Sequence, residues 1–131
     1  MAGFTDYLED KVLDHVFGGS AYTAPSTLYV GLFTAAPSDT GGGTEVSGGS
    51  YARKSMAAMT VSGTSPTTAT NGAAVEFVTA TGSWGDISHT GIFDASSGGN
   101  LLCWAALSAS KTVASGDVIR FDAGDLDVTL A

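Results

Sequence analysis

The sequence has 131 residues, of which 44% are hydrophobic, 14% are charged and 18 are glycine. This length fits one domain with a single modest core, and the glycine content disfavours a helical bundle. Thirteen acidic against five basic side chains leave a net charge of -8, which would repel a phosphate backbone and argues against direct binding of DNA or RNA.

The segment 5–17 is predicted to be the only helix of the chain. Four apolar residues recur at the spacing of a helical turn: Phe4, Leu8, Val12 and Val16. Thr5 can cap its N-terminus, and Gly18 with Gly19 can end it. Because an isolated helix of this length is marginally stable, we expect its apolar stripe to be covered by a sheet or by another subunit.

Residues 27–34 are predicted to form a central strand, because both faces of the segment are apolar. Further segments of strand character lie at 51–61, 74–79, 86–94, 101–107, 117–122 and 126–130. About seven strands at this spacing are typical of an antiparallel sandwich. We therefore predict a mainly β fold in a single domain, 1–131: an antiparallel β-sandwich of about seven strands over 27–130, with one N-terminal amphipathic helix.

Two polar segments are predicted to be loops. The first, 36–50, contains Gly41, Gly42 and Gly43 and is too long for a simple hairpin. We expect it either to be mobile or to be ordered by a partner. The second, 63–72, is rich in threonine and serine.

Seven side chains are candidates for an interface. Phe4 and Leu8 belong to the apolar stripe of the helix, and Tyr29 and Phe33 form the aromatic face of strand 27–34. Arg53 and Lys54 are the only adjacent positive charges, and Trp84 is a tryptophan between two glycines. The positive pair either faces an acidic patch on a neighbour or is simply solvated. Trp104 follows an apolar run and is expected in the core.

No grouping of residues predicts an enzyme or a cofactor site. No serine lies in a Gly-x-Ser-x-Gly elbow, and neither histidine has an evident catalytic partner. We expect His89 to be half-buried and hydrogen-bonded across the sheet, with a ligand or pH-switch role as the alternative. Cys103, the single cysteine, is expected to be a buried thiol.

Three aspartates near the C-terminus, Asp122, Asp125 and Asp127, are the one candidate for a metal site. Calcium prefers several oxygen ligands, but the twelve-residue loop pattern is missing. Alternation favours a solvated strand face, and we predict no bound metal.

Membrane insertion is also not expected. The longest apolar run, 101–107, is far shorter than the roughly twenty residues that a spanning helix needs. The acidic, polar start of the chain shows no evident export signal. The single cysteine, Cys103, cannot form an internal disulfide, as expected for a protein made and assembled in a reducing cytoplasm.

One pattern of short stretches extends across nearly the whole chain. The stretches are 4–19, 22–25, 28–32, 48–53, 80–85, 89–95, 98–102 and 123–126. This pattern resembles a family of short virion proteins of tailed bacteriophages, catalogued as tail fibre proteins. The resemblance implies a non-enzymatic virion part made in a bacterium. It weakens over 51–72, so contacts made there do not carry over.

The leading hypothesis is an oligomeric module on the exterior of the virion that acts as capsid decoration, or cement. Two or three copies would cluster and contact the major capsid protein. The alternative is a tail fibre or baseplate component that contacts tail proteins or the host surface. A third hypothesis, from another class, is a glycan-binding or calcium-dependent adhesion domain.

Overall fold

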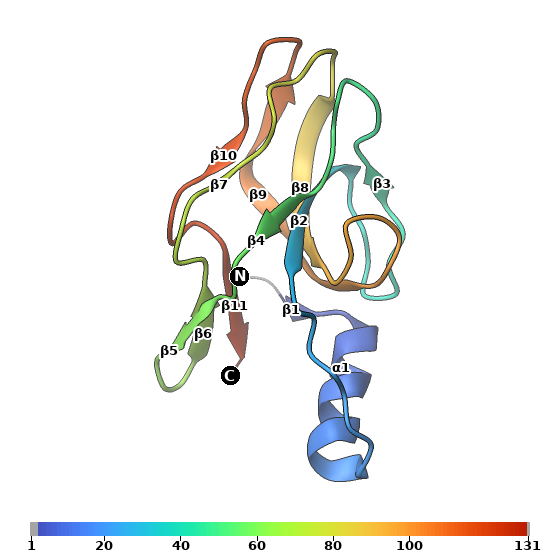
Figure 1. The fold of residues 1–131 in the computed structure, drawn as a ribbon, viewed down its shortest axis with the longest axis vertical. Coiled ribbons are helices and arrows are strands. Elements are labelled where there is room, and N and C mark those ends of the chain that lie inside the picture. Colours follow the sequence, from blue (N-terminus) through green and yellow to red (C-terminus); the bar gives the residue numbers. More distant parts are fainter. Residues whose placement is uncertain (1–2, 131) are drawn as a thin grey trace.

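The computed structural model describes residues 3–130 (Figure 1). The helical elements of these residues are α1 (Asp6–Leu13) and η1 (Asp14–Gly18), a turn of π-helix. The strands are β1 (Gly3–Phe4), β2 (Leu28–Ala35), β3 (Thr44–Glu45), β4 (Lys54–Met56), β5 (Thr60–Ser62), β6 (Thr67–Thr70), β7 (Val75–Glu76), β8 (Gly85–Phe93), β9 (Leu101–Val113), β10 (Arg120–Phe121) and β11 (Asp127–Leu130). The strand pairs are antiparallel. The prediction of a mainly β, antiparallel fold with one helix near the N-terminus is confirmed.

Thr5 fixes the start of the helix. Its side-chain oxygen accepts a hydrogen bond from the Leu8 N–H at 3.4 Å and donates to the Leu101 carbonyl at 2.7 Å. The cap therefore also ties the helix to β9. At the other end, Gly19 adopts a left-handed conformation with φ 79°, and its N–H donates a hydrogen bond to the Asp14 carbonyl, which ends the π turn.

The largest sheet has the order β1-β9-β8-β2-β3, and β4 also pairs with β2. Strand β2 thus has neighbours on both edges, which confirms its prediction as a central strand. The register places Gly31 opposite Gly91. A register shift in β8 between Ile87 and His89 breaks the simple alternation of faces that the sequence suggests.

Two small sheets, β10-β7 and β11-β6-β5, complete the fold. The β7-β10 sheet packs against the large sheet through the main core, to which Val75 and Phe121 contribute. The main core lies between the layers, because it joins residues from the large sheet with residues from both small sheets and their connections, such as Val30, Leu32, Ile92, Phe77, Phe121 and Leu126. Burying these side chains is the main favourable term of folding.

Asn71, directly after β6, ties this end of the strand to the turn between β10 and β11. This side chain is buried, and its amide group donates to the carbonyls of Ala73 and Asp122 at 2.9 and 3.0 Å. Its oxygen accepts from the N–H groups of Gly124 and Leu126. All four hydrogen bonds of a buried amide are therefore made.

Two predicted boundaries are wrong. The segment 51–61 is divided into β4 and β5, which lie in different sheets. The predicted polar loop 63–72 contains β6, which pairs with β5 and β11. Threonine has a high strand propensity, so the threonine-rich composition of this segment is compatible with a strand as well as with a loop.

The glycine-rich segment 36–50 is held by its own chain. It contains β3, the buried Val46, and backbone hydrogen bonds in both directions between Ser38 and Gly41. Gly43 has φ 75°, and a side chain there would collide with the Pro37 backbone. These contacts tie the segment to the large sheet through the pairing of β3 with β2.

Across residues 3–130, neither the length nor the apolar character of any helix would allow it to cross a membrane.

Candidate interaction surface

The structure first corrects the role predicted for Trp84. This residue is 3% exposed, and its indole N–H donates to the Gly49 carbonyl at 2.9 Å. The rings of Tyr51 and Phe77 meet it edge to face, with centroids at 5.3 and 6.4 Å. The prediction of Trp84 as an interface anchor is wrong, because the ring is already enclosed by the core.

Trp104 is the more accessible of the two tryptophans. The register of β8 and β9 pairs it with Gly91 on the outer face of the large sheet, and the ring is only half-buried. Its N–H donates to Asp39 at 3.2 Å, and the His89 ring lies 5.8 Å away. Trp104 therefore packs at the margin of a core cluster formed by Phe33, Phe93 and Leu101, and not in the main core, because neighbouring residues of a strand point to opposite faces.

Phe33 also lacks the exposure that an interface residue needs. It is buried in a second cluster on the outer face with Phe93 and Leu101, where the two phenylalanine rings stack at 5.9 Å. Tyr29 lies half-buried at the margin of this cluster. The aromatic face of β2 is therefore covered within the chain, which corrects the expectation for Phe33 and leaves Tyr29 partly accessible.

Arg53 is a structural clamp. Its side chain is 8% exposed, and its guanidinium donates twice to the Glu45 carboxylate at 2.8 Å. The same group donates to the carbonyls of Ala95 and Gly98 and lies 3.4 Å from the centre of the Phe93 ring. Arg53 is thus neither solvated nor free to meet an acidic neighbour, which overturns both readings of this residue.

Two neighbours explain the position of this clamp. The Tyr51 hydroxyl donates to Glu45 at 2.7 Å and accepts from the Leu32 N–H at 3.0 Å. Burial raises the pKa of the Tyr51 hydroxyl well above its usual range. A side chain at Gly31 would collide with Phe93 and approach Glu45, so glycine leaves room for the clamp.

Lys54 alone of the predicted positive pair remains exposed.

The groups with potential chemistry are also engaged in the fold. Cys103 is buried, as predicted, and burial raises the pKa of its thiol to about 12. His89 is half-buried, as predicted, but the hydrogen bond of its Nδ1 is with the adjacent Ser88 hydroxyl at 2.7 Å and not across the sheet.

The three C-terminal aspartates do not converge. Asp122 accepts from Arg120 at 2.8 Å, and the Asp125 carboxylate accepts from the Asp122 backbone N–H. The oxygen Oδ1 of Asp127 is buried without a hydrogen-bond partner. Within residues 3–130, no group of three or more His, Cys, Asp or Glu side chains is placed to hold a metal ion.

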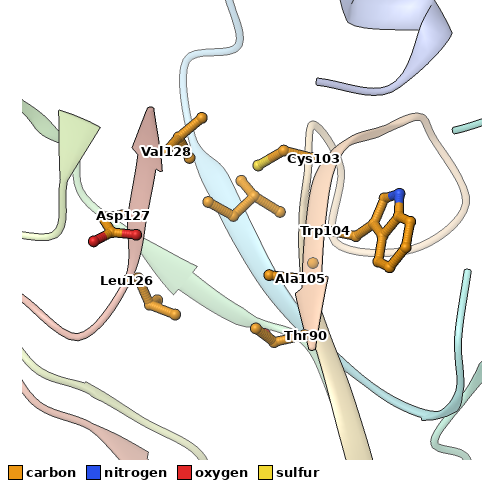
Figure 2. A pocket seen from close by; sticks show the side chains of 9 residues that line it. Thr90, Cys103, Trp104, Ala105, Leu126, Asp127 and Val128 are labelled. Atoms are coloured by element: carbon orange, nitrogen blue, oxygen red, sulfur yellow. The ribbon is translucent and has the colours of Figure 1, made fainter. Parts of the chain in front are cut away.

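A small cavity lies between β11 and the pair β8-β9 (Figure 2). It measures about 10 Å³ and is lined mainly by apolar groups, including Cys103, Ala105 and Leu126. Figure 2 shows the Asp127 carboxylate turned away from Cys103 and Ala105. A space of this size holds at most one water molecule, so it offers no site for a larger ligand.

The helical arm, which we define as α1 together with η1, contains no buried residue. Its first half contacts the β body, by which we mean the three sheets. There Leu8 packs against the main core, and Phe4, just before the arm, pairs with Cys103. Its second half extends away from the sheets (Figure 1) and exposes Leu13 by 59%, Val16 by 61% and Phe17 by 81%. The predicted apolar stripe is therefore covered only at its start.

The β5-β6-β11 sheet extends from the same end of the molecule as the helical arm (Figure 1). On this sheet Val61 and Leu130 are 67% and 57% exposed. Most of the exposed large apolar side chains of the described chain therefore lie at this end. Sequence reasoning had placed the interface at Phe4 and Leu8, whereas the accessible side chains are the later ones of the same stripe.

The chain matches the family model described as Gp80, podophage GP4 fiber I protein gp80, over residues 3–129. The search of curated proteins finds no match. The match covers the helical arm and nearly all of the β body. The chain therefore belongs to the podophage GP4 fiber I protein gp80 family and is a bacteriophage structural protein.

Proposed function

We infer that the chain is a non-enzymatic component of the virion exterior that attaches to other virion proteins through the end carrying the helical arm. The exposure of Leu13, Val16 and Phe17 on this arm is the observation that carries the proposal. Contiguous apolar surface of this kind marks interaction sites. Catalysis forms no part of the proposal, since the most reactive candidate, Cys103, is buried and protonated at neutral pH.

A tail fibre component is the placement that the family description favours. In this reading, the β body with its helical arm is one module of an appendage, and its partners are tail proteins of the phage. The host surface would be contacted by other parts of the appendage or by the end of the body opposite the arm.

Capsid decoration is the second candidate. It is supported by the shape of the described chain, which is a layered β body with a short arm and not an extended shaft (Figure 1). In this reading, many copies of the module dock on the shell, and the major capsid protein is the partner.

Clusters of two or three copies fit either placement. The chain carries no charged side chain from Ser55 to Val75, a stretch that includes β5 and β6 and the exposed Val61. Identical copies could meet there without bringing like charges together. The proposed contact between copies therefore lies on the β5-β6 hairpin.

The copy number of the protein in purified phage particles tests these placements. Quantitative mass spectrometry gives the molar ratio of this chain to the major capsid protein. Hundreds of copies per particle would support decoration, and a handful would support a fibre. Absence of the chain from mature particles would overturn the proposed function in both forms.

A further inference from the structure

We propose that the second half of the helical arm inserts into an apolar groove, rimmed by lysine or arginine side chains, on a different protein of the virion. This inference rests on the proposed function and names the chemistry of the partner. It assigns the insertion to Leu13, Val16 and Phe17 and the contact with the basic rim to Asp10 and Asp14.

The apolar part of the argument comes from the spacing of the exposed side chains. Leu13 and Phe17 are four residues apart and line one shallow surface depression together with Asp10, Asp14 and Gly18. Residues at this spacing share one side of a helix. A helix whose apolar residues share a side is recognised by a complementary groove.

The charged part of the argument comes from an unfavourable arrangement at the tip of the arm, which is the η1 turn (Asp14–Gly18). Asp14 opens the last turn, and its carboxylate lies over Gly18, where a side chain would collide with it. The C-terminus of a helix carries partial negative charge and favours cations. Within residues 3–130, the Asp14 carboxylate makes no hydrogen bond or ion pair. A cation supplied by a partner would relieve this arrangement.

The arm cannot supply that cation itself. Lys11 lies 4.0 Å from Asp10 and 5.7 Å from the centre of the Tyr7 ring, one turn before the tip. The Nδ1 atom of His15 accepts a hydrogen bond from the Tyr22 N–H at 3.0 Å, so this nitrogen is already engaged and not directed at Asp14. The acidic side chains of the arm, Asp6, Glu9, Asp10 and Asp14, outnumber its single lysine.

The same charges argue against a second copy of this chain as the occupant. Two arms packed side by side would bring two sets of these carboxylates together, on molecules that each carry a net charge of -8. A contact between copies is better placed on the uncharged β5-β6 hairpin. The groove is therefore expected on another protein.

Rebinding to particles that lack this chain measures the apolar contribution. Phage particles assembled without the protein serve as the probe, and the labelled protein is titrated against them. We expect Phe17→Gln to raise the dissociation constant at least tenfold. We expect Val78→Gln, a matched control at an exposed valine on the body, to change it less than twofold. Equal affinities of the Phe17 variant and the wild type would overturn the proposal.

Asp14→Asn measures the charged contribution. We expect this variant to bind the same particles several-fold more weakly and to lose part of the decrease in affinity that added NaCl causes in the wild type. Its melting temperature should not fall, because the substitution removes a negative charge from the negative end of a helix. A lower melting temperature together with unchanged salt dependence would show a purely structural role and overturn this part.

Photo-crosslinking identifies the occupant. With a benzophenone amino acid in place of Phe17, we expect crosslinks in the virion to a different protein, at a peptide that contains lysine or arginine. Crosslinks to another copy of this chain would overturn the proposal while leaving the proposed function intact. The proposed function itself fails if the wild-type protein neither occurs in particles nor binds those that lack it.

Discussion

The β body and the tip of the helical arm differ in how far they enclose large aromatic and charged side chains. In the body, the guanidinium of Arg53 makes four hydrogen bonds, and the indole of Trp84 is enclosed by rings and a carbonyl. At the tip, Phe17 is 81% exposed and Asp14 lies at the end of the helix where its charge is unfavourable. The comparison teaches that side chains whose types suggest binding stabilise the fold, whereas the tip leaves large apolar side chains and a carboxylate in contact with water.

Trp84→Ala should have the largest effect on the body. Removing an enclosed tryptophan leaves a cavity, and it takes one of two hydrogen bonds from the Gly49 carbonyl, which still accepts from the Thr81 N–H. We therefore expect a loss of about 3–5 kcal/mol in the free energy of unfolding. Urea denaturation measures this loss. Trp104→Ala serves as the control, because Trp104 is only half-buried, and it should cost clearly less. Equal losses for the two variants would refute the assignment of Trp84 to the core.

Arg53→Ala should destabilise the body by about 2–3 kcal/mol, since the substitution leaves Glu45 without its ion-pair partner. The expected cost is at the lower end for a buried ion pair because the Glu45 side chain is 25% exposed. Lys54→Ala, which changes the exposed neighbour, should stay within about 0.5 kcal/mol of the wild type. Chemical denaturation of both variants tests this difference, and similar values for the two would mean that the clamp contributes nothing.

Alkaline pH should weaken the body through Cys103 and Tyr51, whose pKa values are both raised by burial. The folded state keeps these groups protonated while the unfolded chain releases their protons. Stability is therefore complete below about pH 9, the ordinary pKa of the thiol, and decreases above it. For Cys103 the slope reaches about 1.4 kcal/mol per pH unit, up to pH 12.

Cys103→Ala checks this effect. Denaturation at pH 8 and pH 10 should show a smaller decrease for the variant than for the wild type. The same decrease in both proteins would show that the thiol does not contribute.

Substitutions at the tip should have the smallest effects on the isolated protein. We expect Phe17→Gln to change the free energy of unfolding by less than about 0.5 kcal/mol. We expect Asp14→Asn to raise it by about 0.3–1 kcal/mol, because the carboxylate opposes the helix dipole. Thermal denaturation at low salt measures both. Strong destabilisation by either variant would show that the tip, like the body, is part of the fold.

Local patterns in the sequence were sufficient for several elements. Thr5, the apolar period and the glycine pair predicted the helix, and the two apolar faces of residues 28–33 predicted a central strand. These signals act over a few residues, so a neighbouring element does not alter them. The burial of Cys103 also followed from its immediate neighbours.

The candidate site required information that the sequence pattern does not contain. The roles of Trp84 and Trp104 depend on the register between β8 and β9, and the clamp of Arg53 depends on Glu45 and on carbonyls more than 40 residues away. The helical stripe was recognised, but the point where the body stops covering it is a tertiary property. For this reason Phe4 and Leu8 were chosen as interface residues, while Leu13, Val16 and Phe17 are the accessible ones.

Electron cryomicroscopy of intact phage particles is the most direct test of the central claim, which is that this protein attaches to the virion by its helical arm. We predict density for the β body on the outside of the particle, with α1 and η1 directed into a neighbouring protein and Phe17 buried in the contact. Particles in which the body is present but the arm projects into solvent would contradict the account.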